Sequence, residues 1–227
     1  LTHQPLSFSV SETTEGVHIH IIDAELMGKG EKEKKDLYIE GIQNNGIINH
    51  YEYIINSEGT IEIRHVLKPE GKMPLWFPRI GLTLTVSDAL DQVKWYGRGP
   101  QENYPDRKTG YPTGIYASTV QAMYEPYLMP QDYGLRTDVR WLQLTTDKGI
   151  GLQFKMNEWF NFNIYPYSTD NLTKAMYTYQ LQKQKGMTLN LDYATTGVGC
   201  TARGVFGAYK AMPQEYRRTI SIRPMMK

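Results

Sequence analysis

Hydrophobic and polar residues alternate along most of the chain, and a repeat of two residues is typical of β-strands. Near the start, Leu6, Phe8 and Val10 share one face of such a strand, and His18 and His20 share a face of the next. The same alternation predicts strands over residues 49–56, 60–68, 79–86, 92–96, 140–145, 150–156, 160–165, 188–193 and 217–223. The first two of these are separated by a short break that contains a glycine, so we expect them to form a hairpin.

The segment 97–141 interrupts this alternation. Five prolines disfavour regular structure there, and a connection of this length usually has a function. After the strand at 160–165, residues 168–176 can cap and start a short helix. The mixed charges of residues 29–36 indicate a solvated loop. Because strands dominate and no repeat or linker divides the chain, we expect one antiparallel all-β sandwich domain over residues 1–227.

Composition and charge exclude several classes of function. The 227 residues are 40% hydrophobic and 22% charged, as in a globular domain with a sizeable core. A net charge of +1 gives no reason to expect a nucleic-acid partner. No stretch approaches the roughly 20 apolar residues of a membrane helix, so no membrane partner is expected. The first residues carry no secretory signal. The single cysteine, Cys200, excludes an internal disulfide and a cysteine-based zinc cluster, and it leaves the compartment open.

Candidate catalytic and metal-binding residues are few. All five histidines lie in the first third of the chain. His18 and His20 could chelate a metal, but no third ligand stands at a recognisable spacing, so a solvated sheet face is the expectation. Carboxylates are plentiful: Glu102, Asp106, Asp132, Asp138 and Asp192. The sequence pairs none of these for hydrolysis. The arginines beside Glu102 and Asp106 favour an ionic network that braces a loop.

The run Trp95–Arg107 is long and rare in composition, and it carries a resemblance. It is similar to the signature Gly-x-Gly-Pro-x-Glu-Asn-Tyr-x-Asp-Arg of the C-terminal domain of large β-galactosidases of glycoside hydrolase family 2. Further matches follow in the family's order at 124–127, 130–136, 140–141, 160–164, 189–192 and 197–199. The structural residues that the resemblance points to are Gly99, Glu102, Asn103, Tyr104, Asp106, Arg107 and Arg136.

The resemblance implies an antiparallel β-supersandwich similar to galactose mutarotase, with its first strands missing. Residues 1–227 would then be a fragment, the C-terminal domain of a multidomain β-galactosidase that hydrolyses terminal β-D-galactosides with retention. Its two catalytic glutamates would lie on a barrel domain outside this chain. We therefore expect the chain alone to be inactive and to need no cofactor, with any Mg²⁺ or Na⁺ of the parent enzyme bound by residues elsewhere. Its expected partners are the other domains, the galactoside and a second copy in a homo-oligomer.

The resemblance also implies a substrate-binding loop after the glycine turn 197–199. Relatives place a tryptophan there as a wall of the sugar pocket, and that position falls near Gly204, within residues 200–204 of this chain. The candidate substrate-binding residues are Cys200, Thr201, Arg203, Gly204 and Phe206.

Two alternatives from other classes stay open. A free-standing carbohydrate-binding module would present aromatic platforms, for which Tyr116, Tyr124, Tyr127 and Trp141 are the candidates. A mutarotase-like aldose epimerase would need a histidine and a glutamate to converge on the sugar. The absence of histidine after His65 counts against the second alternative.

Overall fold

The computed structural model describes residues 2–26, 45–200 and 204–226, and it divides into two compact units. The first contains the chain up to Phe77 together with Met212–Arg223, and the second contains Pro78–Ala211 together with the residues from Pro224 onward. The expected solvated loop at 29–36 lies outside the described residues. The expectation that residues 1–227 form one domain stays a prediction.

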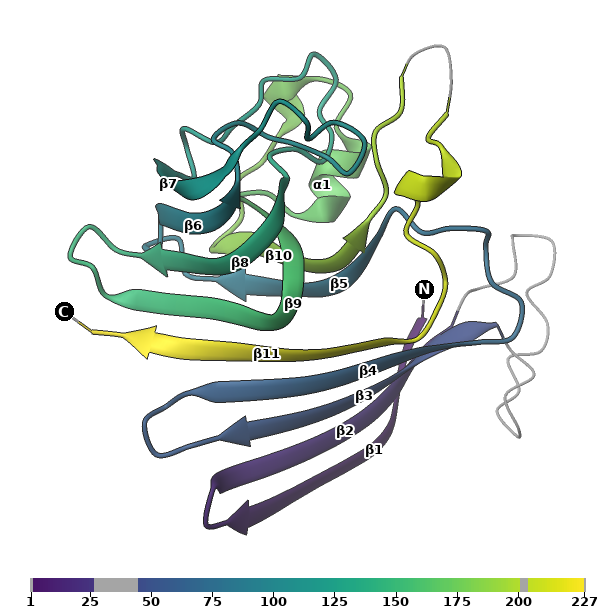
Figure 1. Ribbon diagram of the computed structural model, residues 1–227, viewed down its shortest axis with the longest axis vertical. Helices are drawn as coiled ribbons and strands as arrows, with labels where there is room; N and C mark the ends of the chain where they lie inside the picture. The colour runs from purple at the N-terminus through teal and green to yellow at the C-terminus, as the bar shows by residue number, and fades with distance from the viewer. Residues whose placement is uncertain (1, 27–44, 201–203, 227) are drawn as a thin grey trace. The chain divides into compact units, whose positions relative to one another are not determined.

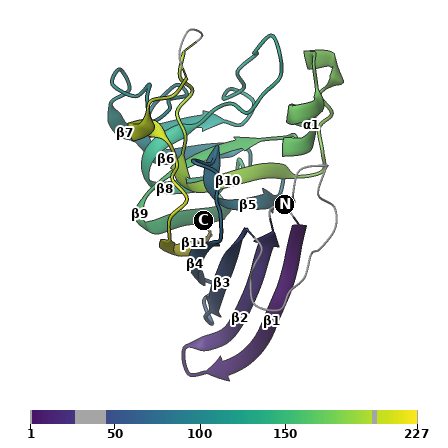
Figure 2. The same cartoon turned by 90° about the vertical axis from the view of Figure 1, so that its right-hand side faces the viewer.

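The first unit is a five-stranded antiparallel sheet in the order β1-β2-β3-β4-β11 (Figure 1). Its strands are β1 (Thr2–Thr13), β2 (Gly16–Leu26), β3 (Gly46–Ile55), β4 (Ile61–Glu70) and β11 (Tyr216–Met225). Figure 2 shows β1, β2, β3 and β4 side by side. The alternation of the sequence decides which side chains share the apolar face of this sheet. Tyr53 on β3 is paired with Ile19 on β2 and with Ile63 on β4, and Ile63 is paired with the fully buried Ile220 on β11.

The second unit is also antiparallel, with strand order β7-β6-β8-β9-β10-β5. Its strands are β5 (Arg79–Val86), β6 (Gln92–Arg98), β7 (Thr113–Thr119), β8 (Arg136–Thr145), β9 (Gly151–Tyr165) and β10 (Met187–Thr195). Its core holds large, fully buried side chains, among them Trp95, Leu142, Phe154 and Leu189. The burial of these side chains supplies most of the driving force for folding.

Helices in the described ranges are short: α1 (Thr169–Lys174), η1 (Thr178–Gln180) and η2 (Gly207–Tyr209). The Ser168 hydroxyl caps α1 by accepting a hydrogen bond from the Asn171 amide at 3.0 Å. No helix in these ranges is long and apolar enough to cross a membrane. The all-β antiparallel class expected from the sequence is confirmed.

Two details of the sequence prediction are wrong. The proline-rich segment 97–141 contains the regular strand β7, which pairs with β6 as the last strand of its sheet order. An outer strand pairs on one side only, so prolines close to it are tolerated. The two strands expected at 150–156 and 160–165 are one continuous strand, β9. The exposed residues 157–159 break the alternation because β9 bulges there: Val139 pairs with Phe160 and Trp141 with Lys155, so the single residue 140 of β8 stands opposite residues 156–159 of β9.

Candidate functional site

The signature loop, residues 99–107, is organised around the carboxylate of Glu102, which is 6% exposed. Arg107 donates to Glu102 from Nη2 at 2.8 Å, and the backbone amide of Gly134 donates at 2.9 Å. The hydroxyls of Tyr104 and Tyr127 donate to the same carboxylate. Four donors on one buried carboxylate tie the signature loop to the segments around residues 127 and 134.

The two tyrosines act as donors because they stay protonated. Burial, followed by the nearby charge of Glu102, raises the pKa of Tyr104. Burial and the hydrogen bond to Glu102 raise the pKa of Tyr127 to about 12. Both hydroxyls therefore keep their protons for the carboxylate over the physiological range of pH.

Asn103 and Arg136 hold the signature loop against β8. The backbone N–H of Asn103 donates to the Leu135 carbonyl at 2.8 Å, and the side-chain oxygen of Asn103 accepts from the backbone N–H of Thr137 at 3.1 Å. Arg136 is 3% exposed and donates from Nη2 to the Pro100 carbonyl at 2.9 Å. Burial lowers the pKa of Arg136 to about 10, so the guanidinium is still charged at neutral pH.

Gly99 is needed where the signature loop crosses aromatic rings. A Cβ atom at this position would lie 2.8 Å from the ring of Tyr116 and 3.0 Å from that of Trp95. These two rings pack on each other with centroids 5.5 Å apart. Any larger side chain would push this aromatic pair apart.

Asp106 connects the signature loop to a turn about ninety residues further on in the sequence. Its Oδ1 accepts from the amide of Val198 at 3.0 Å, and its Oδ2 accepts from the amide of Gly199 at 2.7 Å. A Cβ atom on Gly197 would lie 2.3 Å from Cγ of Asp106, so the carboxylate can approach only because this residue is glycine. Gly199 has a φ of 66°, in the left-handed region that glycine enters at little cost. Asp106 thus fixes the turn at 197–199.

The other side of this turn is held by the chain that returns from the 200–206 loop. The Gly197 amide donates to the Tyr209 carbonyl at 2.8 Å, and the Ala211 amide donates to the Thr196 hydroxyl at 2.9 Å. The two ends of the 200–206 loop are therefore joined at its base by hydrogen bonds.

The five candidate substrate-binding residues all belong to the 200–206 loop. Cys200 is a free, exposed thiol, and the Phe206 side chain is 66% exposed. A Cβ atom on Gly204 would meet nothing within 4 Å. Thr201 and Arg203 lie outside the described residues. The described part of the loop thus offers an exposed aromatic ring and a thiol beside a firmly held base.

A polar hollow of about 210 Å³ opens beside this base. Pro105 and Lys108 line it from the end of the signature loop, and Asp138, Trp159 and Asn161 line it from β8 and β9. Residues 193–195 and 208–211 form its other sides. The exposed Trp159 ring, with the Arg140 guanidinium 4.1 Å from its centroid, offers a flat stacking surface.

Asp138 is the charged centre of this hollow. Its carboxylate accepts from Arg98 Nε at 2.5 Å and from Lys108 Nζ at 2.9 and 3.0 Å. Burial opposes ionisation, but these two donors outweigh it and lower the pKa of Asp138. Among the residues described, Asp138 alone has a positive φ without being glycine, at 54°. Its backbone conformation and its charge are both fixed by neighbours, so it can position a ligand hydroxyl but holds no proton to transfer.

Two more candidate carboxylates bind one arginine. Arg79 Nη2 lies 3.1 Å from Asp192 Oδ2 and 3.3 Å from Asp132 Oδ2. Burial raises the pKa of Asp192 to about 6, with Arg79 opposing the shift. Asp192 is 1% exposed, so a substrate cannot reach it in this fold.

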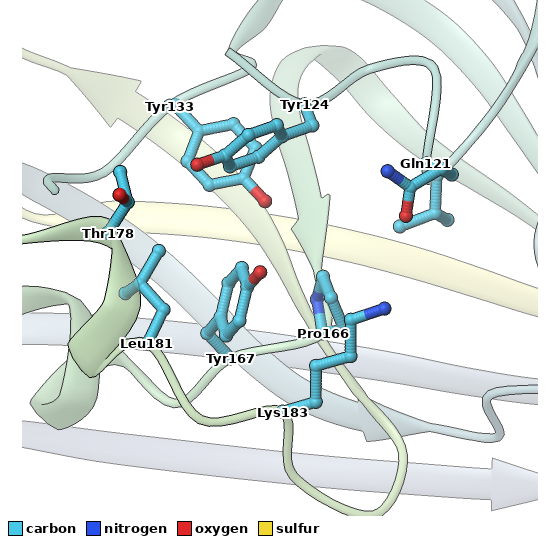
Figure 3. A pocket seen from close by; sticks show the side chains of 9 residues that line it. Gln121, Tyr124, Tyr133, Pro166, Tyr167, Thr178, Leu181 and Lys183 are labelled. Atoms are coloured by element: carbon cyan, nitrogen blue, oxygen red, sulfur yellow. The ribbon is translucent and has the colours of Figure 1, made fainter. Parts of the chain in front are cut away.

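A second hollow, of about 180 Å³, is lined by tyrosines. Figure 3 shows Tyr124 and Tyr133 on one side of it and Tyr167 with Leu181 on the other. Tyr124 and Tyr133 meet edge to face with centroids 5.3 Å apart. The amine of Lys183, the amide of Gln121 and the hydroxyl of Thr178 are among the polar groups that line it.

Of the other proposed aromatic platforms, Tyr127 packs next to this hollow against the same buried tyrosines, and Tyr116 and Trp141 do not line it. Tyr127 donates to Glu102, Tyr116 packs on Trp95, and Trp141 tilts against Tyr96. Only Tyr124 among the four candidates lines the tyrosine hollow. The structure therefore does not gather the four into one sugar-binding face.

In the first unit, His18 and His20 are joined by Glu52, a residue that sequence reasoning had not selected. Sequence reasoning also did not select Trp159 beside the 200–206 loop, and it covered Asn161 only through the family match at 160–164, without a role in the site. The signal that could have found Trp159 is an exposed tryptophan between two strand-like runs. The cross-strand neighbour of a histidine pair has no comparable local signal.

Comparison with known proteins gives a clear family match. The family model described as "Beta galactosidase small chain" matches residues 8–222. The chain is 38% identical to a β-galactosidase of Priestia megaterium over 147 residues, which is 65% of this chain and 14% of that protein. It is 39% identical to a β-galactosidase of Vibrio cholerae over 122 residues, which is 54% of this chain and 11% of that protein. The chain thus spans only a small part of the length of these relatives.

Among solved structures, a GalM/aldose epimerase homologue from C. elegans aligns with 95% of this chain and 67% of its own. The TM-score is 0.45 and the sequence identity is 12%.

Proposed function

Because the chain belongs to the β-galactosidase small-chain family, we propose that it is a non-catalytic part of an enzyme that hydrolyses terminal β-D-galactosides. In this proposal the acid/base and nucleophile are glutamates on a barrel domain outside the chain, and any Mg²⁺ or Na⁺ is bound there as well. The chain has two tasks. It braces the barrel, and its 200–206 loop completes one wall of the sugar pocket.

The observation that carries the proposal is the bond of Asp106 to the amides of Val198 and Gly199. It joins the most distinctive segment of the sequence to the turn from which the 200–206 loop starts. A hydrogen bond to an ionised group contributes about 1.5–3 kcal/mol, so two of them restrict the turn strongly. A wall for a substrate must be held in this way, because an unfixed loop would lose conformational entropy on binding.

The other carboxylates of the second unit support a non-catalytic role. A retaining glycosidase needs two carboxyl groups about 5 Å apart, both open to the sugar. Glu102 and Asp192 are buried against arginines, and Asp138 is held by Arg98 and Lys108. Glu102 and Asp192 are too deeply buried to reach a glycosidic bond, and Asp138, which lines the polar hollow, is kept ionised by its two cationic partners and so holds no proton for an acid step.

Phe206 supplies the chemistry expected of a pocket wall. Its side chain is 66% exposed, and Phe206 is the last residue of the 200–206 loop. The C–H-rich face of a galactose ring stacks well on an aromatic surface, which removes water from both. In this proposal Phe206 takes over the stacking role where Gly204 lacks a side chain.

Kinetics of the complete enzyme test the proposal. In Asp106→Ala the turn at 197–199 loses both carboxylate contacts, so KM for a nitrophenyl galactoside is expected to rise about tenfold, the equivalent of about 1.4 kcal/mol, with kcat changed much less. Asp106→Asn keeps one acceptor oxygen and should give an intermediate KM. The matched control is Asp170→Ala, which removes an exposed carboxylate of α1. Asp106→Ala with an unchanged KM would overturn the positioning role.

The chain by itself provides the second arm of the test. We expect no hydrolysis of nitrophenyl galactoside by the purified chain, because the proposal places both catalytic glutamates elsewhere. Hydrolysis that co-purifies with the chain would refute a non-catalytic role. Galactose binding with a change in tyrosine or tryptophan fluorescence would favour a carbohydrate-binding module, and faster mutarotation in polarimetry would favour an epimerase.

A further inference from the structure

The polar face of the sheet in the first unit brings two histidines and a glutamate together. His18 and His20 are two residues apart on β2, so their side chains project from the same face. The register between β2 and β3 places Glu52 directly opposite His20. Cross-strand neighbours have Cβ atoms about 5 Å apart, which is within reach of a shared ligand.

The ligand atoms of these three residues lie close to the spacing that a shared metal ion requires. His18 Nδ1 is 3.4 Å from Glu52 Oε1, and His20 Nε2 is 3.9 Å from the same oxygen. All three ligand atoms lie within 4.8 Å of one another. Zinc bonds of about 2.0–2.2 Å at tetrahedral angles separate ligand atoms by roughly 3.3 Å. A small movement of the partly exposed His20 ring would therefore bring the three ligand atoms to the separation that a bound zinc ion requires.

The charges around the cluster favour a cation. Arg64 Nη1 binds the second oxygen of Glu52 at 3.1 Å, which leaves Oε1 turned to the histidines. Arg64 is also paired with Glu62, at 2.8 Å from Nε. Two carboxylates against one guanidinium leave one net negative charge beside two imidazoles. Arg64 thus orients the carboxylate in the way that outer-shell partners orient metal ligands.

The environment of His18 also suits a ligand that binds through Nδ1. Its side chain is 13% exposed, and its buried Nε2 has no hydrogen-bond partner among the residues described. Within the described part of the chain, Glu52 lies 3.4 Å from Nδ1, and the His20 ring stacks on the His18 ring with centroids 6.4 Å apart. Nδ1 is therefore the nitrogen that can share a metal ion with the glutamate.

We propose that His18, His20 and Glu52 bind one divalent transition-metal ion, with Zn²⁺ the best fit. Two imidazoles and a carboxylate are ligands of the kind that Zn²⁺ prefers, and the exposed side of His20 leaves room for water at the fourth position. The ion would join β2 to β3 and stabilise the folded sheet by mass action. This inference does not depend on the proposed role in galactoside hydrolysis.

Titration of the full chain with Zn²⁺ tests the site. The experiments use a Cys200→Ser background, because the exposed thiol could bind Zn²⁺ on its own. We expect one Zn²⁺ per chain by isothermal titration calorimetry, and His20→Gln should weaken it by at least roughly 100-fold, since loss of even an outer-shell partner costs 10–100-fold. His20 is half exposed, so its replacement should leave the fold intact, which circular dichroism checks.

A matched variant and a second probe make the result specific. His50→Gln removes an imidazole from β3, two residues from Glu52, but His50 is outside the three-residue cluster, so Zn²⁺ affinity should stay within about twofold of the parent chain. Co²⁺ should give the visible absorption of a low-coordinate complex in the parent chain, and His20→Cys should restore binding and add a thiolate-to-metal band.

The proposal is overturned if the parent chain binds no Zn²⁺ above the level of His20→Gln. Equal loss of affinity in His50→Gln and His20→Gln would also overturn it, because binding would then depend on the histidine content and not on this cluster. Failure of the galactosidase proposal would leave these expectations unchanged.

Discussion

The polar face of the sheet in the first unit and the signature loop of the second unit hold their polar side chains in opposite ways. In the sheet of the first unit, the backbone N–H and C=O groups of neighbouring strands bond to each other. The strands therefore do not need the side chains of the polar face to hold them together. His20 and Glu52 there are partly exposed and make only loose contact. In the second unit, long irregular connections have few ladder bonds. Buried side chains such as Glu102 and Asn103 replace these bonds, each with several partners.

This difference shows where new chemistry can be added. A polar group that already accepts four hydrogen bonds, as Glu102 does, has no capacity left for a ligand. A pair of histidines beside a carboxylate has lone pairs to spare. Loss of a polar side chain should therefore cost stability at the signature loop and binding capacity at the cluster of His18, His20 and Glu52.

The largest effect is expected for Glu102→Ala. The variant leaves the Arg107 guanidinium, the Gly134 amide and two tyrosine hydroxyls without their acceptor, and breaking a buried pair in this way costs about 3–5 kcal/mol. Chemical denaturation followed by tyrosine and tryptophan fluorescence measures the loss. The control is Glu215→Ala, which breaks the exposed pair with Arg217 and should cost less than about 1 kcal/mol. Equal losses in the two variants would contradict the contrast.

A smaller effect, dependent on pH, is expected from His65 in the first unit. Its side chain is 1% exposed, and burial lowers its pKa to about 4. The unfolded histidine, with a pKa near 6.5, takes up a proton on acidification before the folded one does. The free energy of unfolding should therefore fall by about 2 kcal/mol between pH 6.5 and pH 5 from this residue alone.

Denaturation curves of the parent chain and of His65→Gln, measured across that pH range, check this expectation. The glutamine variant is less stable at pH 7 but should lose less stability on acidification, because the titrating group is gone. A variant with the same pH slope as the parent would show that another group is responsible.

The smallest effect is expected from a pair of glycines. In Gly197→Ala the new methyl group would meet the Asp106 carboxylate at 2.3 Å, so the turn at 197–199 must shift, at a cost of about 1–2 kcal/mol. Gly110→Ala is the matched change, because a Cβ atom there meets nothing within 4 Å. Thermal unfolding of both variants should show a lower Tm only for the first. A lower Tm for both would mean that the contact with Asp106 is not the cause.

Much of the fold could be predicted from the sequence, because strands depend on a local repeat. The alternation in β5 or β4 is visible in eight to ten consecutive residues, and the strands found there match it closely. The strand β7 was missed because the prolines around it outweigh a short alternation. The break at residues 157–159 led to the prediction of two strands for a similar reason. Three consecutive exposed residues interrupt the alternation, although the strand β9 continues through them.

The candidate sites were harder to predict, because they depend on contacts between distant segments. The resemblance of residues 95–107 to a known signature marked Asp106 as structural, but nothing local shows that it binds amides ninety-two and ninety-three residues away. Glu52 faces His20 only through the register of β2 against β3, and a connection as long as the one between them does not fix a register.

Protection of Cys200 by substrate tests the central claim most directly. It is the one cysteine of this chain, it is exposed, and it begins the 200–206 loop. In the complete enzyme, a saturating galactoside analogue should slow alkylation of Cys200 several-fold, followed by mass spectrometry of its peptide, while the chain alone should show no protection. An alkylation rate that the analogue leaves unchanged in the complete enzyme would contradict the placement of this loop at the sugar pocket.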